Sequence, residues 1–246
     1  MALDPLAVAV AIIFVSVGAY VRGYSGFGSS LIWVSGMSVV FPPILVVPAV
    51  YMLEIVASLG LLPGVWRQAD WRSLRWLFLG VALGLPIGLH LLASLPPAPV
   101  RVAIAVVVLA ATFLLSRGFA LKAIPGPLPA ACTGTVSGLL NGWTGIGGPP
   151  VILFYFSAPA PIQVSRASLI AFLFVLDVIA LAVAGSQDLV TREVFVLAAL
   201  LSAPVLIGIW LGNRRFVQTP PATFRRFVVV LLALLSCAVL VRAFLA

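Results

Sequence analysis

The chain has 246 residues, of which 63% are hydrophobic and only 8% are charged, and its formal net charge is +8. Soluble domains are about 45–50% apolar and about 25% charged, so this composition excludes a soluble fold and predicts an all-α polytopic membrane protein. The positive charge does not indicate nucleic-acid binding, because the basic residues lie in short loops between apolar segments, where the positive-inside rule places them.

Apolar segments follow one another along the chain. A helix needs ~20 apolar residues to cross a bilayer, and segments approaching that length are 44–63, 74–95, 100–116, 167–184, 193–212 and 224–245. Segments flanking two glycine-rich runs are mostly shorter, at 5–21, 29–42, 128–141 and 149–157. We predict that these form two hairpins of half-spans, 5–42 and 128–157, with the glycines at their tips. Segment 5–21 is nearly long enough to cross alone, and the alternative is that it forms a full span.

The two glycine-rich runs repeat one short pattern about 120 residues apart. The first reads GYSGFGSSLI from Gly23 to Ile32, and the second reads GWTGIGGPPV from Gly142 to Val151. The matching residues are Gly23 with Gly142, Tyr24 with Trp143, Ser25 with Thr144, Gly26 with Gly145, and Gly28 with Gly147. Unwound backbone is tolerated at membrane depth only where protein surrounds it or a wet cavity lies beside it. Paired broken segments in the two halves of a chain indicate a transporter's binding site.

The basic loops indicate how the chain is oriented. Arginine and lysine concentrate in the loops 64–75, 117–127, 158–166 and 213–226, at Arg67, Arg72, Arg75, Arg117, Lys122, Arg166, Arg214, Arg215, Arg225 and Arg226. If these loops are cytoplasmic, the chain starts outside and the two hairpins enter the membrane from opposite faces. We therefore predict two inverted repeats, 1–122 and 123–246, each with a broken-helix hairpin and three transmembrane helices.

A helix that begins just after a glycine run can bind an anion without a charged side chain, because its first N–H groups are free and its dipole is positive there. Pro149 and Pro150 suit the first turn of such a helix. We expect substrate contacts from two short stretches, at Gly23, Ser25, Gly26, Gly28, Gly142, Thr144, Gly145 and Gly147. Trp143 either lines this site or packs. The alternative is that the small residues serve only close helix packing.

Arg22 precedes the first run, and Asn141 holds the matching place before the second. An arginine deep in a bilayer costs at least ~2.5–3.5 kcal/mol, so a carboxylate, a substrate anion or water must compensate it. We predict that Arg22 and Asn141 contact a substrate oxyanion, which a guanidinium can bind through two parallel hydrogen bonds. In the alternative, segment 5–21 crosses fully and Arg22 reaches the cytoplasmic interface.

Two acidic residues lie within predicted spans, Glu54 in 44–63 and Asp177 in 167–184. Ionisable residues inside a membrane are functional by default, and we predict that both couple transport to protons. The alternative is that each is a static partner of Arg22, Arg166 or a helix end. The chain has one histidine and lacks the H-E-x-x-H and G-x-x-x-x-G-K-[ST] patterns. We therefore expect no metal, no cofactor and no ATP hydrolysis.

These residues resemble the TauE/SafE sulfite exporter family of four-plus-four-segment permeases. The resemblance covers essentially the full length of the chain. It rests on GYSGFGSSLI with Pro42, Pro43 and Glu54, and on SGLLNGWTGIGGPPVILFY with Arg166 and Asp177. It implies a multi-pass protein of the bacterial inner membrane that transports sulfite, a sulfonate or another small organosulfur anion.

We therefore predict a secondary transporter for a small anion, which works by alternating access of the two repeats with proton coupling as an added feature. The expected partners are the anion and the lipid bilayer, without nucleic acid, and a homodimer is left open. One alternative is a passive anion channel. A membrane-embedded enzyme is a further alternative, although the sequence has no visible nucleophile–base or metal constellation.

Overall fold

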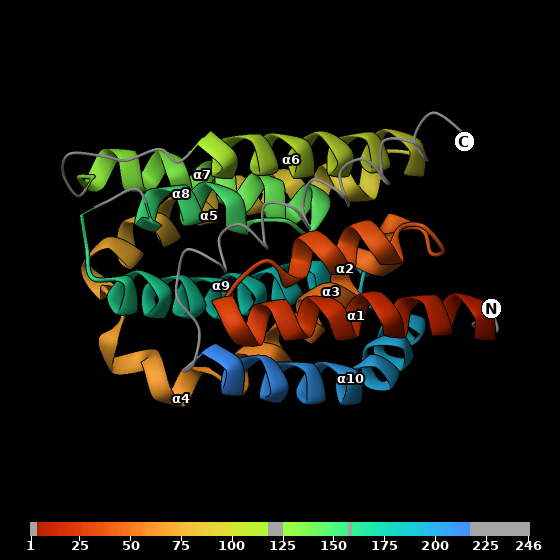
Figure 1. Cartoon of the computed structure of the whole chain (residues 1–246). Coiled ribbons are helices and arrows are strands. Elements are labelled where there is room, and N and C mark those ends of the chain that lie inside the picture. Colours follow the sequence, from red (N-terminus) through yellow and green to blue (C-terminus); the bar gives the residue numbers. More distant parts are fainter. Residues whose placement is uncertain (1–3, 118–124, 157–158, 217–246) are drawn as a thin grey trace.

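The computed structural model describes residues 4–117, 125–156 and 159–216, and every regular element in these ranges is a helix (Figure 1). The predicted all-α fold is therefore confirmed. In chain order the elements are α1 (Pro5–Ser25), α2 (Ser29–Met37), α3 (Pro43–Leu59), α4 (Leu62–Val65), the 3₁₀ helix η1 (Trp66–Gln68), α5 (Trp71–Ser94), α6 (Pro97–Arg117), α7 (Pro127–Thr144), α8 (Gly148–Phe156), α9 (Ile162–Ser186) and α10 (Arg192–Phe216). The predicted last span, 224–245, lies outside the described residues, as do Lys122, Arg225 and Arg226.

Within the described ranges, four helices are long and apolar enough to cross a membrane: α1, α5, α9 and α10. A fifth span results if α3 is counted together with Leu62–Gln68, which continues it after a bend of 58°. The predicted span 44–63 covers α3 and the bend that follows it, because α3 ends at Leu59 and the chain bends before Leu62. These lengths agree with a multi-pass membrane protein.

Each glycine-rich run breaks the chain between a long helix and a short one. The first break, residues 26–28, joins the 21 residues of α1 to the nine of α2, and the second, residues 145–147, joins the 18 of α7 to the nine of α8. The second arms are short helices, as the sequence predicts, and their being half-spans stays a prediction. The first arms are longer than predicted, because the helices continue into the glycine runs. At 1.5 Å per residue α1 is about 31 Å long, which is long enough to cross a bilayer.

Local sequence accounts for where several helices begin. Proline occupies the first turn of α1, α3 and α7, where a missing N–H leaves no hydrogen bond unmade. Asp4 caps α1, and Asp70 caps α5 by accepting hydrogen bonds from the N–H groups of Arg72 and Ser73 at 3.1 and 3.3 Å. Pro149 lies in the first turn of α8, as the sequence predicts.

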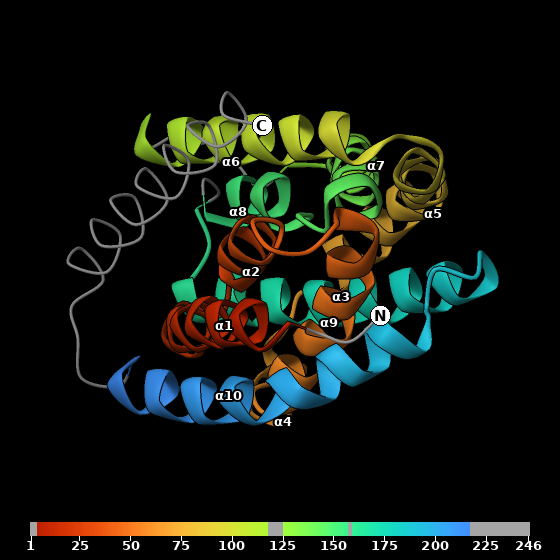
Figure 2. The same cartoon turned by 90° about the vertical axis from the view of Figure 1, so that its right-hand side faces the viewer.

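Two pairs of parallel helices form opposite sides of the molecule, α1 with α10 and α5 with α7 (Figure 2). Glycine lets their backbones approach closely. A Cβ atom at Gly212 on α10 would lie 2.2 Å from the Tyr20 carbonyl oxygen on α1, and one at Gly84 on α5 would lie 2.0 Å from the Thr135 carbonyl oxygen on α7. Small residues at such interfaces are the usual way in which membrane helices associate.

Gly23 and Gly142, predicted as unwound substrate contacts, belong to these helix interfaces instead. Both are helical residues, in α1 and α7. A Cβ atom at Gly23 would lie 2.4 Å from the Ile209 carbonyl oxygen, and one at Gly142 would lie 2.6 Å from the Leu85 carbonyl oxygen. The backbone of these two glycines is thus helical rather than unwound and serves close helix packing, and their contact with a substrate stays a prediction.

We expect Gly84→Val to destabilise the protein, because the new side chain would overlap the α7 backbone and force α5 and α7 apart. Overpacking of this kind costs about 1–3 kcal/mol or more. Thermal unfolding in detergent would measure it. The control is Gly64→Ala, since no atom lies within 4 Å of a Cβ atom at Gly64. Equal unfolding temperatures for the two variants would contradict the close α5–α7 contact.

Helices α3 and α9 run antiparallel through the centre, from one break to the other (Figure 1). Arg166, near the start of α9, lies against the first break, and Leu176, further along, lies against the second. Val47, near the start of α3, lies against the second break, and Ser58, near its end, is hydrogen-bonded to α1. An inverted repeat requires its equivalent helices to run in opposite directions. The division into repeats and their inversion across the membrane stay predictions.

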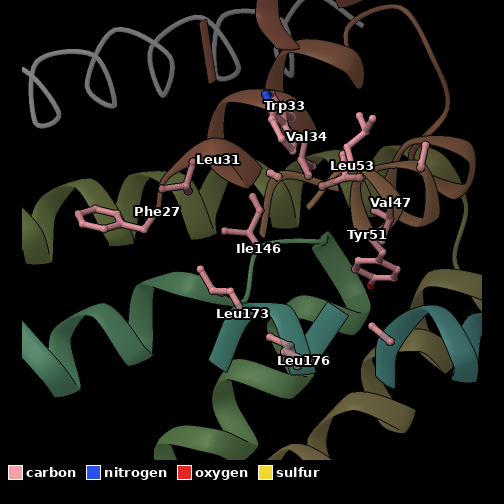
Figure 3. Packing of buried hydrophobic residues seen from close by; sticks show 14 of the residues in the cluster. Phe27, Leu31, Trp33, Val34, Val47, Tyr51, Leu53, Ile146, Leu173 and Leu176 are labelled. Carbon is pink, nitrogen blue, oxygen red and sulfur yellow. The ribbon is translucent and has the colours of Figure 1, made fainter. Parts of the chain in front are cut away.

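Buried apolar side chains surround the second break and the middle of the two central helices. Figure 3 shows Val47 and Tyr51 of α3, Ile146 of the second break, and Leu173 and Leu176 of α9, all of them buried. A polar group in such surroundings is costly unless it is hydrogen-bonded or paired. The polar side chains of this region must therefore satisfy one another.

Candidate functional site

The two breaks begin with the same backbone geometry. Gly26 ends α1 with a φ of +85°, and Gly145 ends α7 with a φ of +73°. The Gly26 N–H donates to the Arg22 carbonyl oxygen at 2.6 Å, and the Gly145 N–H donates to the Asn141 carbonyl oxygen at 2.8 Å. Positive φ favours glycine, which explains the residue type at both positions. The unwound backbone is therefore confined to three residues in each half, fewer than the glycine pattern predicts.

The breaks differ at their last glycine. Gly28 has a φ of +90°, whereas Gly147 does not have a positive φ. Gly147 is held by hydrogen bonds instead: its N–H donates to the Asn141 Oδ1 at 3.1 Å, and its carbonyl oxygen accepts from the Ser137 hydroxyl at 2.5 Å. The backbone polar groups of Gly147 thus already have partners within the protein.

The hydroxyl groups predicted to contact the substrate are bonded to backbone. The Thr144 hydroxyl donates to the Leu140 carbonyl oxygen at 2.8 Å. The Ser25 hydroxyl lies 2.7 Å from the carbonyl oxygens of Val21 and Phe27 and accepts from the Phe27 N–H at 3.2 Å. In this structure both side chains stabilise the ends of the long helices rather than present donors to a ligand.

Arg22 lies inside the protein, and its guanidinium is bound to other side chains. The residue is 1% exposed and forms an ion pair with Glu54 of α3. Its Nη1 donates to the Ser29 hydroxyl at 3.3 Å and its Nη2 to the Ser58 hydroxyl at 2.6 Å. The Ser29 hydroxyl in turn donates to the Glu54 Oε1. Arg22 is therefore enclosed by protein, and the compensating partner in this structure is a carboxylate. Its depth in the membrane, and with it the alternative that segment 5–21 crosses fully, stays a prediction.

Asn141 and Asp177 form the corresponding pair in the second half, without a cation. They are 2% and 3% exposed, and the Asn141 Nδ2 donates to the Asp177 Oδ1 at 3.3 Å. The Tyr51 hydroxyl of α3 donates to the Asn141 carbonyl oxygen at 2.6 Å, which ties α3 to the end of α7. Equivalent positions in the two halves thus hold chemically different pairs.

The two pairs form one electrostatic cluster, because the Asp177 carboxyl lies within electrostatic range of both Glu54 and Arg22. Among the described residues this cluster contains one guanidinium and two carboxyl groups. If both acids were ionised, the cluster would carry one uncompensated negative charge away from water, which is costly. One proton on either acid would balance the charge.

Arg166 occupies a place that the sequence does not indicate. The sequence predicts it in a loop, but it lies in the first turns of α9 and packs against the first break. Its Cγ would lie 3.1 Å from a Cβ atom at Gly26, and its Nη2 donates to the Gly23 carbonyl oxygen at 3.4 Å. Val47 takes the equivalent place at the second break. The first break therefore has two arginines beside it.

Trp143 is half-buried on α7, next to the second break. Its backbone nitrogen would lie 2.8 Å from a Cβ atom at Gly88 on α5, so the residue takes part in the close α5–α7 contact. The indole Nε1 has no hydrogen-bond partner among the described residues. The backbone of Trp143 packs against α5, and a role of its side chain in lining the site stays a prediction.

Comparisons with known proteins agree with the resemblance in the motifs. The family model described as "Sulfite exporter TauE/SafE" matches residues 10–239. A protein of Cupriavidus necator described as "Probable sulfite/organosulfonate exporter TauE" is 28% identical over 221 residues, which cover 85% of this chain and 84% of that protein. No solved structure matches the chain. The predicted family and multi-pass membrane location are confirmed, and the bacterial relative fits an inner-membrane location.

Proposed function

The chain belongs to the TauE/SafE sulfite exporter family, and from this premise we propose that it is a secondary transporter for sulfite, a sulfonate or another small organosulfur anion. The choice of sulfur compound is supported by the family and by the name of the Cupriavidus necator relative. The choice of an anion is supported independently by the charges at the first break.

The observation that carries the proposal is the burial of Arg22 beside the start of α2. A guanidinium binds a tetrahedral oxyanion or a carboxylate through the same parallel hydrogen bonds, and here it holds the Glu54 carboxylate. The start of α2 adds the backbone N–H groups of its first turn, of which that of Ser30 now bonds to Glu54, and the positive end of a helix dipole. We infer that the substrate binds at the first break, at Arg22 and the backbone of 26–29.

We propose that the substrate crosses the protein along the two central helices, α3 and α9. α3 and α9 each extend from one break to the other, so a movement of one hairpin can be transmitted to the second through them. Alternating access would then consist of opening the first break to one side of the membrane and closing it to the other, as repeats move against each other. Proton coupling is proposed to use Glu54 and Asp177.

Transport by the purified full chain in proteoliposomes tests this proposal. The panel is labelled sulfite, sulfoacetate, taurine and sulfate, with protein-free liposomes as the control. We expect uptake of at least one sulfur anion, and faster uptake when the vesicles are preloaded with the same unlabelled anion. Uptake without this trans-acceleration would identify a passive channel. If none of the four compounds enters faster than into protein-free liposomes, the proposed function is wrong.

A further inference from the structure

We propose that the Glu54 carboxylate and the substrate anion compete for Arg22, so that each anion bound at the first break is accompanied by one proton taken up by Glu54. This inference rests on the proposed function and assigns the chemical step that links binding to protons. Binding proceeds without a change in total charge at the site: the anion replaces the carboxylate on the guanidinium, and the proton neutralises the carboxylate that leaves.

The contacts of Arg22 favour this competition. Its Nη1 and Nη2 are both engaged, by Glu54, Ser29 and Ser58. Ser29, at the first position of α2, also donates to Glu54. The carboxylate therefore sits between the arginine and the helix start, where an incoming oxyanion would find the same donors. One buried donor of Arg22, its Nε, has no hydrogen-bond partner among the described residues.

The surroundings of Glu54 make an ionised carboxylate without Arg22 unfavourable. Glu54 is 2% exposed, and the Asp177 carboxyl of α9 lies within electrostatic range of it. α1 presents Arg22, and α2 presents the neutral hydroxyl of Ser29 and the Ser30 backbone N–H. α9 also carries Arg166 against the first break, and α6, which contacts α3, carries Arg101. The charged side chains of α10, which packs against α3 as well, occur in the first and last turns of that helix, at Arg192, Glu193, Arg214 and Arg215. Protonation is thus the step that lets Glu54 release Arg22 to an anion.

The second half has no equivalent competition, because Asn141 replaces the arginine. An amide carries no net charge, so the Asn141–Asp177 pair offers an anion no cation to exchange for. The chemical difference between two otherwise matching positions assigns the anion to the first break.

The test measures methanesulfonate binding to the full chain in detergent by calorimetry, since this sulfonate keeps a single negative charge at every pH used. For the unmodified protein we expect the dissociation constant to rise with pH by up to about tenfold per unit once Glu54 ionises in the free protein. Glu54→Gln is expected to bind with a constant that no longer changes with pH. Asp188→Asn removes an exposed acid outside the cluster, at a positive φ that asparagine tolerates, and should behave like the unmodified chain.

A second measurement needs no variant. Titrations of the unmodified protein in buffers of different ionisation enthalpy count the protons taken up, and we expect about one proton per anion at a pH where Glu54 is ionised in the free protein. Binding without proton uptake, or a Glu54→Gln variant that keeps the original pH dependence, would overturn the inference while leaving the transport function intact. If no anion of the transport panel binds or enters at all, the proposed function fails and the inference fails with it.

Discussion

Replacing Arg22 with alanine is expected to reduce anion transport by about two orders of magnitude, and to destabilise the fold as well. Truncating one partner of a buried charge pair costs about 2–5 kcal/mol, and each 1.4 kcal/mol corresponds to a factor of ten. Glu54, Ser29 and Ser58 would lose their common partner in an interior where Glu54 is 2% exposed. Labelled sulfite uptake and thermal unfolding in detergent measure the two effects.

A variant with an uncharged pair at positions 22 and 54 distinguishes loss of anion binding from loss of stability. In the double variant Arg22→Gln with Glu54→Gln, both charges are removed and the side chains can still hydrogen-bond to each other. We expect its unfolding temperature to recover toward that of the unmodified protein while sulfite uptake stays lost, because the cation is absent. Arg22→Lys keeps the charge without the planar fork and should retain part of the activity. Normal uptake by the neutral pair would show that Arg22 does not bind the substrate.

The sequence predicts the breaks well because their cause is local. Positive φ at Gly26 and Gly145 requires glycine, so two glycine runs in register mark where each helix must end. Proline at the starts of α3 and α7 has a similarly local effect. The all-α architecture follows from composition alone, since only helices satisfy their own backbone inside a bilayer when no barrel pattern is present.

The residues whose positions differ from the prediction are held by contacts between distant parts of the chain. Gly23 stays helical where α10 packs on it, and Gly142 stays helical where α5 packs on it. α10 follows Gly23 by many residues in the sequence, and α5 precedes Gly142 by many residues. In the sequence Arg166 looks like any basic loop residue. In the structure α9 begins at Ile162, so that Arg166 lies in this helix and packs against the first break. Arg22 could be recognised as needing a partner. The choice between Glu54, a substrate and water required the three-dimensional distance.

Asp177→Asn is expected to abolish proton-driven accumulation of the anion while leaving anion exchange intact. Asp177 and Glu54 lie in one cluster, and Asp177 extends it toward the second break, where Asn141 holds it. We expect a proton to reach Glu54 from that direction by way of Asp177, whose role an amide cannot take over. With one proton per anion, the unmodified protein should accumulate anion by up to about tenfold for each unit of pH difference. The variant should reach no accumulation.

Measurements at equal pH on both sides of the membrane distinguish a loss of proton coupling from a general loss of transport. Counterflow needs no net proton movement, so Asp177→Asn should exchange labelled for unlabelled sulfite at close to the normal rate. Binding at equilibrium does not depend on the route of the proton either. The variant should therefore keep the pH dependence of methanesulfonate binding that Glu54→Gln loses. If Asp177→Asn accumulates anion normally, Asp177 is a static partner of Asn141. If instead both exchange and binding are lost, it serves the anion site itself, and protons must reach Glu54 by another path.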